Sequence, residues 1–136
     1  MEPTIFEKII AREVSAEIVY EDDETLAFLD IAPNNVGHTL VIPKKLYRNV
    51  FDIPEDVWLS LMSTVRKLAP HVRDAVGAGG VNITMNNEHA ANQEVFHAHI
   101  HIIPRHEGDG VLFFTKTTYQ EGEMERVGET IRARLR

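Results

Sequence analysis

Three histidines at alternate positions are the residues of this chain best suited to chemistry. His97, His99 and His101 stand in the run FHAHIHIIP, residues 96–104. Single apolar residues separate them, which is the alternation of a β-strand, and we predict a strand over residues 95–104. On such a strand the three imidazoles share one face, roughly 7 Å from one to the next at ~3.3 Å per residue.

This face could bind a metal ion or attack phosphorus. Imidazole is the commonest protein ligand for zinc and similar ions, and His-x-His on a strand can supply two ligands. A neutral imidazole is also a good nucleophile near pH 7, and a bond between phosphorus and imidazole is labile enough to hydrolyse in a second step. A set of partly exposed histidines without a role is the third interpretation, which the strict alternation disfavours. Spacing alone does not decide whether the histidines bind a metal ion or act as a nucleophile.

The remaining elements must hold this strand in place. Thr4 and Glu7 have the spacing of a capping box, so we expect a short helix from there to about Arg12. A second capping box, Asp52 to Glu55, precedes an amphipathic run that predicts a long helix ending near Gly77. Further strands are predicted over 16–20, 25–31, 37–43 and 81–86, and a C-terminal helix over 122–135. Strands gathered around one long helix predict an α+β fold with an antiparallel sheet.

Length, charge and composition restrict the class of protein. The 136 residues fit one domain with a single core. A net charge of −7 disfavours nucleic-acid binding, which needs a basic face. The absence of cysteine excludes disulfides and cysteine-based zinc sites. The sequence shows no signal segment and no membrane-length apolar run, so we expect a cytoplasmic protein without membrane contact.

The histidine run resembles the His-φ-His-φ-His-φ-φ signature of the histidine-triad (HIT) family, where φ is apolar. Similarity to the family's Hint-like branch extends in order over about residues 4–104, including Leu26 to Ile31 and Gly37 to Lys44. The resemblance thus implies a single HIT domain over 1–136, with its core over 4–104 and a variable C-terminal segment over 105–136. The resemblance implies a five-stranded antiparallel sheet with one long helix and short terminal helices, paired as a homodimer. It also implies hydrolysis or transfer of nucleotides at the α-phosphate through a covalent nucleotidyl-histidine, without a metal or other cofactor.

The resemblance also assigns roles to individual residues. His99 would be the nucleophile, His101 would hold the phosphate oxygens, and His97 and His38 would orient the nucleophile and relay protons. Asp30 would accept hydrogen bonds from the ribose hydroxyls. A purine pocket would be lined by Phe6, Ile9, Phe28 and Ile31. The phosphate side would involve Asn86, Gln93, Glu94 and the backbone N–H of Val95.

Two departures from the family pattern bear on chemistry. Some bacterial relatives bind a structural zinc at positions that correspond here to Thr4, Glu7 and Leu46, which cannot remake that site. We therefore predict no structural zinc. Glu94 stands where many members have serine or threonine. Because a carboxylate repels a phosphate, we expect Glu94 either to favour a cationic leaving group such as an amine or to help proton transfer.

The leading functional prediction is hydrolysis of purine nucleoside 5′-phosphoramidates. Hydrolysis of dinucleoside polyphosphates is the alternative enzyme activity, because another branch of the family prefers those substrates. A nucleotide-binding signalling or interaction module is a second class of function. A metal-dependent hydrolase that uses the histidines as ligands is a third, which the missing carboxylate within the motif disfavours.

Overall fold

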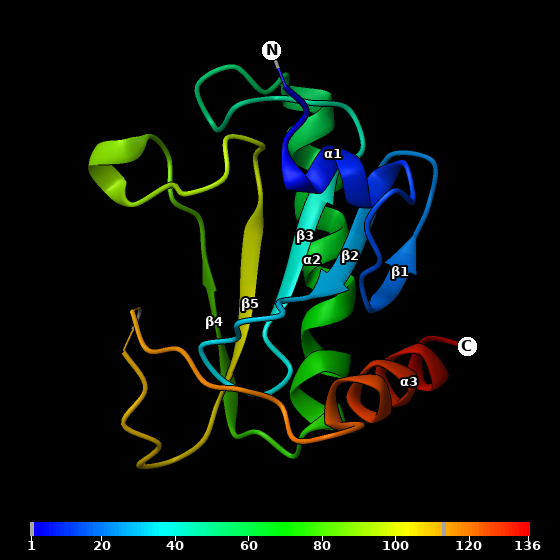
Figure 1. The fold of residues 1–136 in the computed structure, drawn as a ribbon, viewed down its shortest axis with the longest axis vertical. Coiled ribbons are helices and arrows are strands. Elements are labelled where there is room, and N and C mark those ends of the chain that lie inside the picture. Colours follow the sequence, from blue (N-terminus) through cyan, green and yellow to red (C-terminus); the bar gives the residue numbers. More distant parts are fainter. Residues whose placement is uncertain (1, 113) are drawn as a thin grey trace.

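An antiparallel sheet and three α-helices make up the part of the chain that the computed structural model describes, residues 2–112 and 114–136 (Figure 1). The helices are α1 (Ile5–Ile10), α2 (Glu55–Ala75) and α3 (Glu123–Leu135), with a short 3₁₀ helix η1 (His89–Ala91). The strands are β1 (Ile18–Glu21), β2 (Thr25–Leu29), β3 (Thr39–Pro43), β4 (Gly80–Thr84) and β5 (Ile100–Arg105). They form one sheet in the order β1-β2-β3-β5-β4, which confirms the predicted α+β fold.

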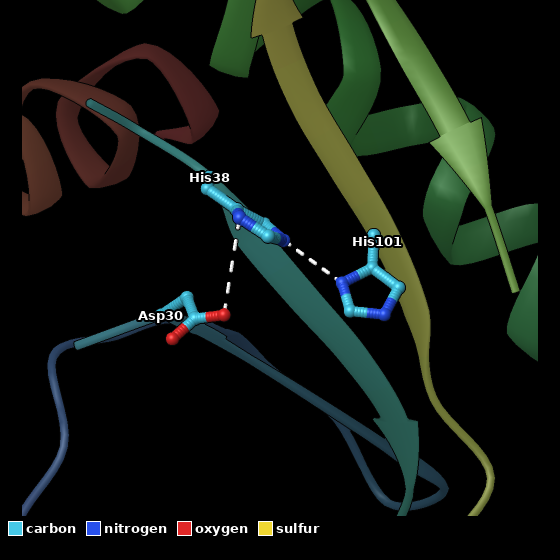
Figure 2. A group of neighbouring side chains, drawn as sticks. All are labelled: Asp30, His38 and His101. Atoms are coloured by element: carbon cyan, nitrogen blue, oxygen red, sulfur yellow. Dashed lines mark hydrogen bonds and ion pairs between the residues drawn. The ribbon is translucent and has the colours of Figure 1, made fainter. Parts of the chain in front are cut away.

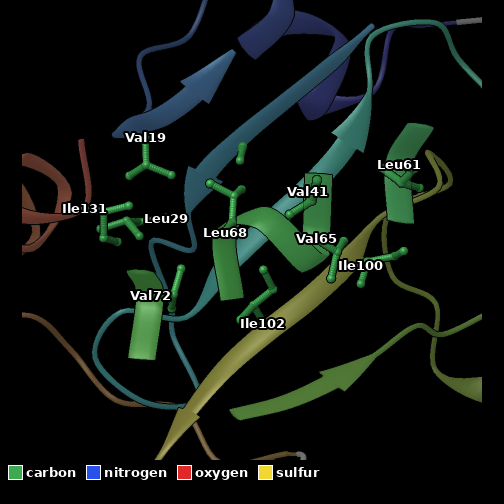
Figure 3. Packing of buried hydrophobic residues seen from close by; sticks show 11 residues of the cluster. Val19, Leu29, Val41, Leu61, Val65, Leu68, Val72, Ile100, Ile102 and Ile131 are labelled. Atoms are coloured by element: carbon green, nitrogen blue, oxygen red, sulfur yellow. The ribbon is translucent and has the colours of Figure 1, made fainter. Parts of the chain in front are cut away.

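Helix α2 covers one face of the sheet and makes the main core (Figures 1 and 3). Ile100 and Ile102 of β5 point to this face, as the sequence alternation predicts. The apolar stripe of α2 packs against them, and α3 adds Ile131. Because side chains alternate along a strand, His101 points to the opposite face. The core therefore fixes which side of the sheet carries the chemistry. The buried stripe of α2 consists of Leu61, Val65, Leu68 and Val72.

Helix α1 covers part of that opposite face. Its capping box is present, since Glu7 N donates to Thr4 Oγ1 (3.1 Å) and Thr4 N donates to Glu7 Oε1 (2.9 Å). Phe6 and Ile9 pack with β2 and β3 in a second, smaller cluster. A six-residue helix has little stability of its own, so this packing and the cap together hold it. The cluster also contains Leu26, Phe28, Leu40 and Ile42.

Strand β5 starts later than predicted. Its ladders with β3 and β4 reach only to Ile100 and His101, so the segment of His97 and His99 lies before the strand. That segment is held instead by Ala98 N, which donates to Tyr47 O at 2.7 Å. The prediction of one continuous strand was wrong because the pairing ends at Val41 with Ile100 on the β3 side and at Thr84 with His101 on the β4 side, so His97 and His99 lie before the paired residues.

The start of α2 also differs from the prediction. Pro54 is the N-cap residue and makes no side-chain capping bond. The Asp52 carboxylate accepts hydrogen bonds from Arg48 N and Asn49 N of the preceding turn, both at 3.0 Å. The expected capping box therefore does not form, because the carboxylate is already used by the preceding loop.

The segment between β5 and α3 crosses back over the molecule and meets the loop between β2 and β3 (Figure 1). Thr117 N donates to Pro33 O at 2.8 Å, and Asn34 Nδ2 donates to Thr115 O. We call residues 114–117 the strap. None of the helices in the described ranges has the length and apolar character needed to cross a membrane.

Candidate active site

Four imidazoles gather where β3 and β5 lie side by side. The rings of His99 and His101 are 5.0 Å apart between centroids, and those of His38 and His101 are 5.1 Å apart. His38, His97 and His99 are buried, and His101 is half-buried. The structure thus brings together all four histidines that the sequence analysis singled out. Figure 2 shows His38 and His101 with Asp30 beside them.

Backbone contacts set the tautomers of His38 and His101. Asn34 N donates to His38 Nδ1 at 3.0 Å, so Nδ1 carries a lone pair and the proton is on Nε2. His38 Nε2 then donates to His101 Nδ1 at 2.8 Å (Figure 2). Because His101 Nδ1 accepts, the neutral ring carries its proton on Nε2. His101 is therefore a hydrogen-bond donor at Nε2.

The tautomer of His99 is set in the same way. Its Nδ1 lies 2.7 Å from the carbonyl oxygen of His97, and a carbonyl can only accept, so Nδ1 is the donor. The lone pair of the neutral ring is therefore on Nε2. His97 Nε2 likewise donates to Pro43 O at 2.7 Å, and His97 Nδ1 is buried without a partner in the described part of the chain. The carbonyl of His97 thus orients the His99 ring, and the ring of His97 attaches this segment to β3.

Burial keeps these imidazoles neutral. It lowers the pKa of His97 and His99 below the ordinary value, and it lowers the pKa of His38 to about 2. Burial, with the neighbouring His99 and Lys116, lowers the pKa of His101 to about 3. At pH 7 the site therefore combines a neutral nucleophile at His99 Nε2 with a neutral donor at His101 Nε2.

Asp30 lies against His38 without forming an ion pair. Its Oδ2 is 3.8 Å from His38 Nδ1 (Figure 2), but that nitrogen accepts from Asn34 N and His38 is uncharged. Asp30 Oδ1 accepts from Ala32 N at 2.9 Å. Burial raises the pKa of the Asp30 carboxyl. One carboxylate oxygen thus remains available to accept hydrogen bonds from a ligand.

Asp30, His38 and His101 also have the residue types of a metal site. Asp30, His38 and His101 offer ligand atoms that all lie within 4.8 Å of one another. However, the lone pair of His38 Nδ1 is already used by Asn34 N–H, and that of His101 Nδ1 by His38 Nε2–H. A metal ion here would have to displace both hydrogen bonds. These residues therefore fit a chain of hydrogen-bonded neutral histidines better than a metal centre.

Two cavities adjoin His99. A polar cavity of about 360 Å³ is lined by His99 and His101, together with Asn86, Glu94 and Lys116. An apolar cavity of about 430 Å³ is lined by residues of α1, of the segment before β1, of β2 and the loop after it, of β3, and of the start of α3. The Phe6 ring lies in the wall of the apolar cavity and contacts the His99 ring edge-on at 5.0 Å. Phe6 therefore connects the apolar cavity, which suits a flat apolar ring, to His99 in the wall of the polar cavity, which suits charged groups.

Most residues predicted for the nucleotide lie in these walls. The apolar cavity contains all four predicted pocket residues and the predicted ribose contact: Phe6, Ile9, Phe28, Ile31 and Asp30. Asn86 and Glu94 line the polar cavity. Val95 packs beside the smaller core cluster.

Gln93 occupies a different environment from the one predicted. It is 2% exposed and is not among the lining residues of either cavity. Its Oε1 accepts from Asn49 Nδ2 (3.0 Å) and Glu88 N (2.8 Å), and its Nε2 donates to Arg48 O (2.7 Å) and Val95 O (3.0 Å). With all these bonds made inside the protein, the amide braces the loop instead of facing a phosphate.

Sequence reasoning missed the strap residue Lys116, which lines the polar cavity. It lies in a segment without periodicity, and only its hydrogen-bonded neighbours Thr115 and Thr117 place it near the histidines. No local pattern could have indicated this, because the contacts join residues about 80 positions apart in the chain.

Comparisons with known proteins agree with this geometry. The HIT domain model matches residues 11–108. The chain is 41% identical over 138 residues to the protein hit of Bacillus subtilis, covering 98% of this chain and 95% of that protein. It is also 41% identical over 105 residues to adenylylsulfatase HINT3 of Arabidopsis thaliana, covering 77% of this chain and 53% of that protein. The crystal structure of a hypothetical histidine triad nucleotide-binding protein from Sulfolobus tokodaii matches with a TM-score of 0.87 at 37% identity, covering 95% of this chain and 89% of that chain. The chain therefore belongs to the HIT family of nucleotide-binding proteins and nucleotide hydrolases.

Proposed function

We propose that this protein hydrolyses purine nucleoside 5′-phosphoramidates at the α-phosphate, through a nucleotidyl-His99 intermediate, as in the Hint-like branch. The observation that carries the proposal is the tautomer of His99. Its Nδ1–H is held by the His97 carbonyl, which leaves the Nε2 lone pair as the nucleophile on a ring that lines the polar cavity.

The reaction has two steps with the same attacking geometry. His99 Nε2 forms a bond to phosphorus while the bond from phosphorus to the amine nitrogen breaks, and the amine nitrogen takes up a proton from solvent as it leaves. Water then attacks phosphorus and releases a proton to solvent, while the bond from phosphorus to His99 Nε2 breaks and its electron pair returns to Nε2. The nucleoside monophosphate is released. In both steps His101 Nε2–H donates to a phosphoryl oxygen on which negative charge develops.

The apolar cavity suits the nucleoside. Phe6, Ile9 and Phe28 provide apolar surface for a purine ring, and Asp30 at the same wall can accept hydrogen bonds from ribose hydroxyls. The name of the relative HINT3, an adenylylsulfatase, supports an adenylylated substrate. With the nucleoside in this cavity, the α-phosphate would lie at His99 and the leaving group would extend into the polar cavity.

Dinucleoside polyphosphates are the second candidate substrates. The polar cavity of about 360 Å³ is larger than a small amine requires, and it contains the basic side chains of Arg105 and Lys116. Both features would suit a leaving group that consists of phosphates and a second nucleoside.

The first test is AMP release from adenosine 5′-phosphoramidate in the presence of EDTA. The wild type is compared with His99→Ala and with His89→Ala, whose exposed side chain lines neither cavity. We expect release by the wild type and by His89→Ala, and loss of release in His99→Ala. Full activity in His99→Ala would refute the nucleophile assignment, and activity only without EDTA would favour a metal-dependent hydrolase. Binding of AMP without release would favour dinucleoside polyphosphates, to be assayed next, and then a binding module.

We also propose that the protein acts as a homodimer. Strand β4 is an edge of the sheet, and its residue Ile83 is 46% exposed. An edge strand with an exposed apolar side chain is suited to pair with a second copy. Light scattering should give the dimer mass at micromolar concentration, and a monomer mass would contradict the proposal.

A further inference from the structure

The polar cavity needs a positive charge that its histidines do not provide. A nucleotide phosphate is anionic, and more charge develops on its oxygens during attack. His38 and His101 are neutral at pH 7, since burial lowers the pKa of the first to about 2 and of the second to about 3. Glu94, a carboxylate, lines the same cavity and adds negative charge. Histidines and Glu94 alone would leave the cavity electrostatically unfavourable for a phosphate.

Two basic side chains line this cavity, and one of them is already neutralised. Arg105 Nε and Nη2 bond to Asp109 Oδ2 and Oδ1 at 3.0 and 2.8 Å, and Arg105 Nη1 donates to Asn82. Such a two-point contact holds the guanidinium to its own carboxylate. Lys116 has no ion pair with any carboxylate in the described residues. Its ammonium group is therefore the basic charge of the cavity wall that no ion pair among the described residues neutralises.

The strap fixes where Lys116 enters the site. The residue on each side of it is bonded to the loop between β2 and β3, Thr115 through its carbonyl to Asn34 Nδ2 and Thr117 through its N–H to Pro33 O. The backbone of Asn34 in turn bonds to His38. Lys116 is thus attached to the same loop that orders the histidine chain. Its charge acts on that chain: together with burial it lowers the pKa of His38 and His101, and it opposes the rise in the pKa of Asp30 that burial causes.

We infer that Lys116 binds the anionic oxygens of the nucleotide phosphate and supplies the positive charge that the neutral histidines lack. Lysine is an effective phosphate ligand because its ammonium is a compact charge with three rotatable donors. The strap thereby becomes part of the binding site, and His101 and Lys116 share the phosphate, one as a neutral donor and the other as a charge. This inference rests on the proposed nucleotide site.

The test is calorimetric binding of AMP and of adenosine, which differ by the phosphate alone. Three variants are compared with the wild type: Lys116→Met, Lys116→Arg and Lys67→Met. Lys67 is an exposed lysine of α2, which covers the opposite face of the sheet from the histidines. In Lys116→Met we expect about tenfold weaker binding of AMP, the size of one lost charge-assisted hydrogen bond, with adenosine binding unchanged. Lys116→Arg should recover most of the loss, and Lys67→Met should bind both ligands as the wild type does.

Raising the salt concentration should weaken AMP binding less in Lys116→Met than in the wild type, because one charge contact is gone. Equal AMP affinity in Lys116→Met and wild type would overturn the inference and leave the proposed function intact. Equal loss of AMP and adenosine binding would also overturn it, because that would show a structural role for the strap. A wild type that binds neither ligand would overturn both the inference and the proposed function.

Discussion

Backbone groups, not carboxylates, determine the protonation of the histidines in this protein. Asn34 N–H and the His97 carbonyl have fixed hydrogen-bonding characters, so His38, His101 and His99 have one favoured tautomer each. A carboxylate hydrogen-bonded to one of these rings would instead have favoured the imidazolium. The fold therefore produces a lone pair on one ring and an N–H on the next without any net charge.

His101→Phe tests this arrangement at the residue scale. Phenylalanine keeps a ring of similar size but removes both nitrogens of His101. The lost Nε2–H is the proposed donor to phosphate, and the lost Nδ1 accepts from His38 Nε2. We expect kcat for phosphoramidate hydrolysis to fall by about 10²–10³, as for the loss of one donor to a developing oxyanion. Steady-state kinetics with a check of the melting temperature would measure it. A kcat within twofold of the wild type in a folded variant would contradict the donor role.

Residue types and their alternation predicted the histidine cluster, but could not predict the tautomers. The apolar partners Ile100 and Ile102 fixed the orientation of His101 in advance, because a strand has only two faces. The hydrogen bonds of Asn34 and His97 depend on loop geometry, which a sequence pattern does not specify. The resemblance to the HIT family was needed to decide between metal ligand and nucleophile.

At the scale of elements, the loop before β5 is held by one buried amide. Gln93 bonds to Asn49, Glu88, Arg48 and Val95, and so ties the loop to the turn that precedes α2. Asn92, just before it, has a left-handed backbone (φ 69°), which closes the turn after η1. The hydrogen bonds of Gln93 therefore hold the segment that leads into His97 and His99, although Gln93 itself lines neither cavity.

Gln93→Leu should therefore affect stability more than ligand binding. It leaves several buried donors and acceptors without partners, for which we expect a loss of about 1–3 kcal/mol in the free energy of unfolding, measured in urea. Gln120→Leu, at an exposed position, is the control. Unchanged stability with loss of AMP binding would show that Gln93 contacts phosphate after all, as the family resemblance implies.

The elements themselves were largely predictable, and their ends were not. Periodicity found α2 and α3, and the Thr4–Glu7 capping box found α1. The start of β5 was misplaced because strand pairing ends with β4, a long-range fact. The strap was not predicted at all, since its hydrogen bonds lie in a segment with no repeating pattern.

Across the whole molecule, burying neutral histidines links folding to pH. An unfolded histidine has a pKa near 6.5, whereas in the native state His38, His97, His99 and His101 have lowered values. Below pH 6.5 the unfolded chain therefore binds more protons than the native chain. Their contribution to stability is present above pH 6.5 and is lost as the pH falls.

We expect the free energy of unfolding to decrease from pH 7 to pH 5, with a slope approaching about 1.4 kcal/mol per pH unit for each fully neutral buried histidine. Urea unfolding at intervals across this range would measure the slope. His38→Asn, which removes one of the buried groups, should give a shallower slope. A stability that does not change between pH 7 and pH 5 would mean that these histidines titrate alike in both states.

The short helix α1 forms part of the wall of the apolar cavity. Phe6 belongs at once to the smaller core cluster, to this cavity and to the contact with the His99 ring. A helix of six residues cannot persist alone, so its attachment to the sheet is a local folding equilibrium of its own. Any molecule that fills the cavity adds contacts only to the attached state. Ligand binding in the apolar cavity and attachment of helix α1 to the sheet are therefore thermodynamically coupled. Slower amide hydrogen exchange over Ile5–Ile10 would report directly that the cavity is filled.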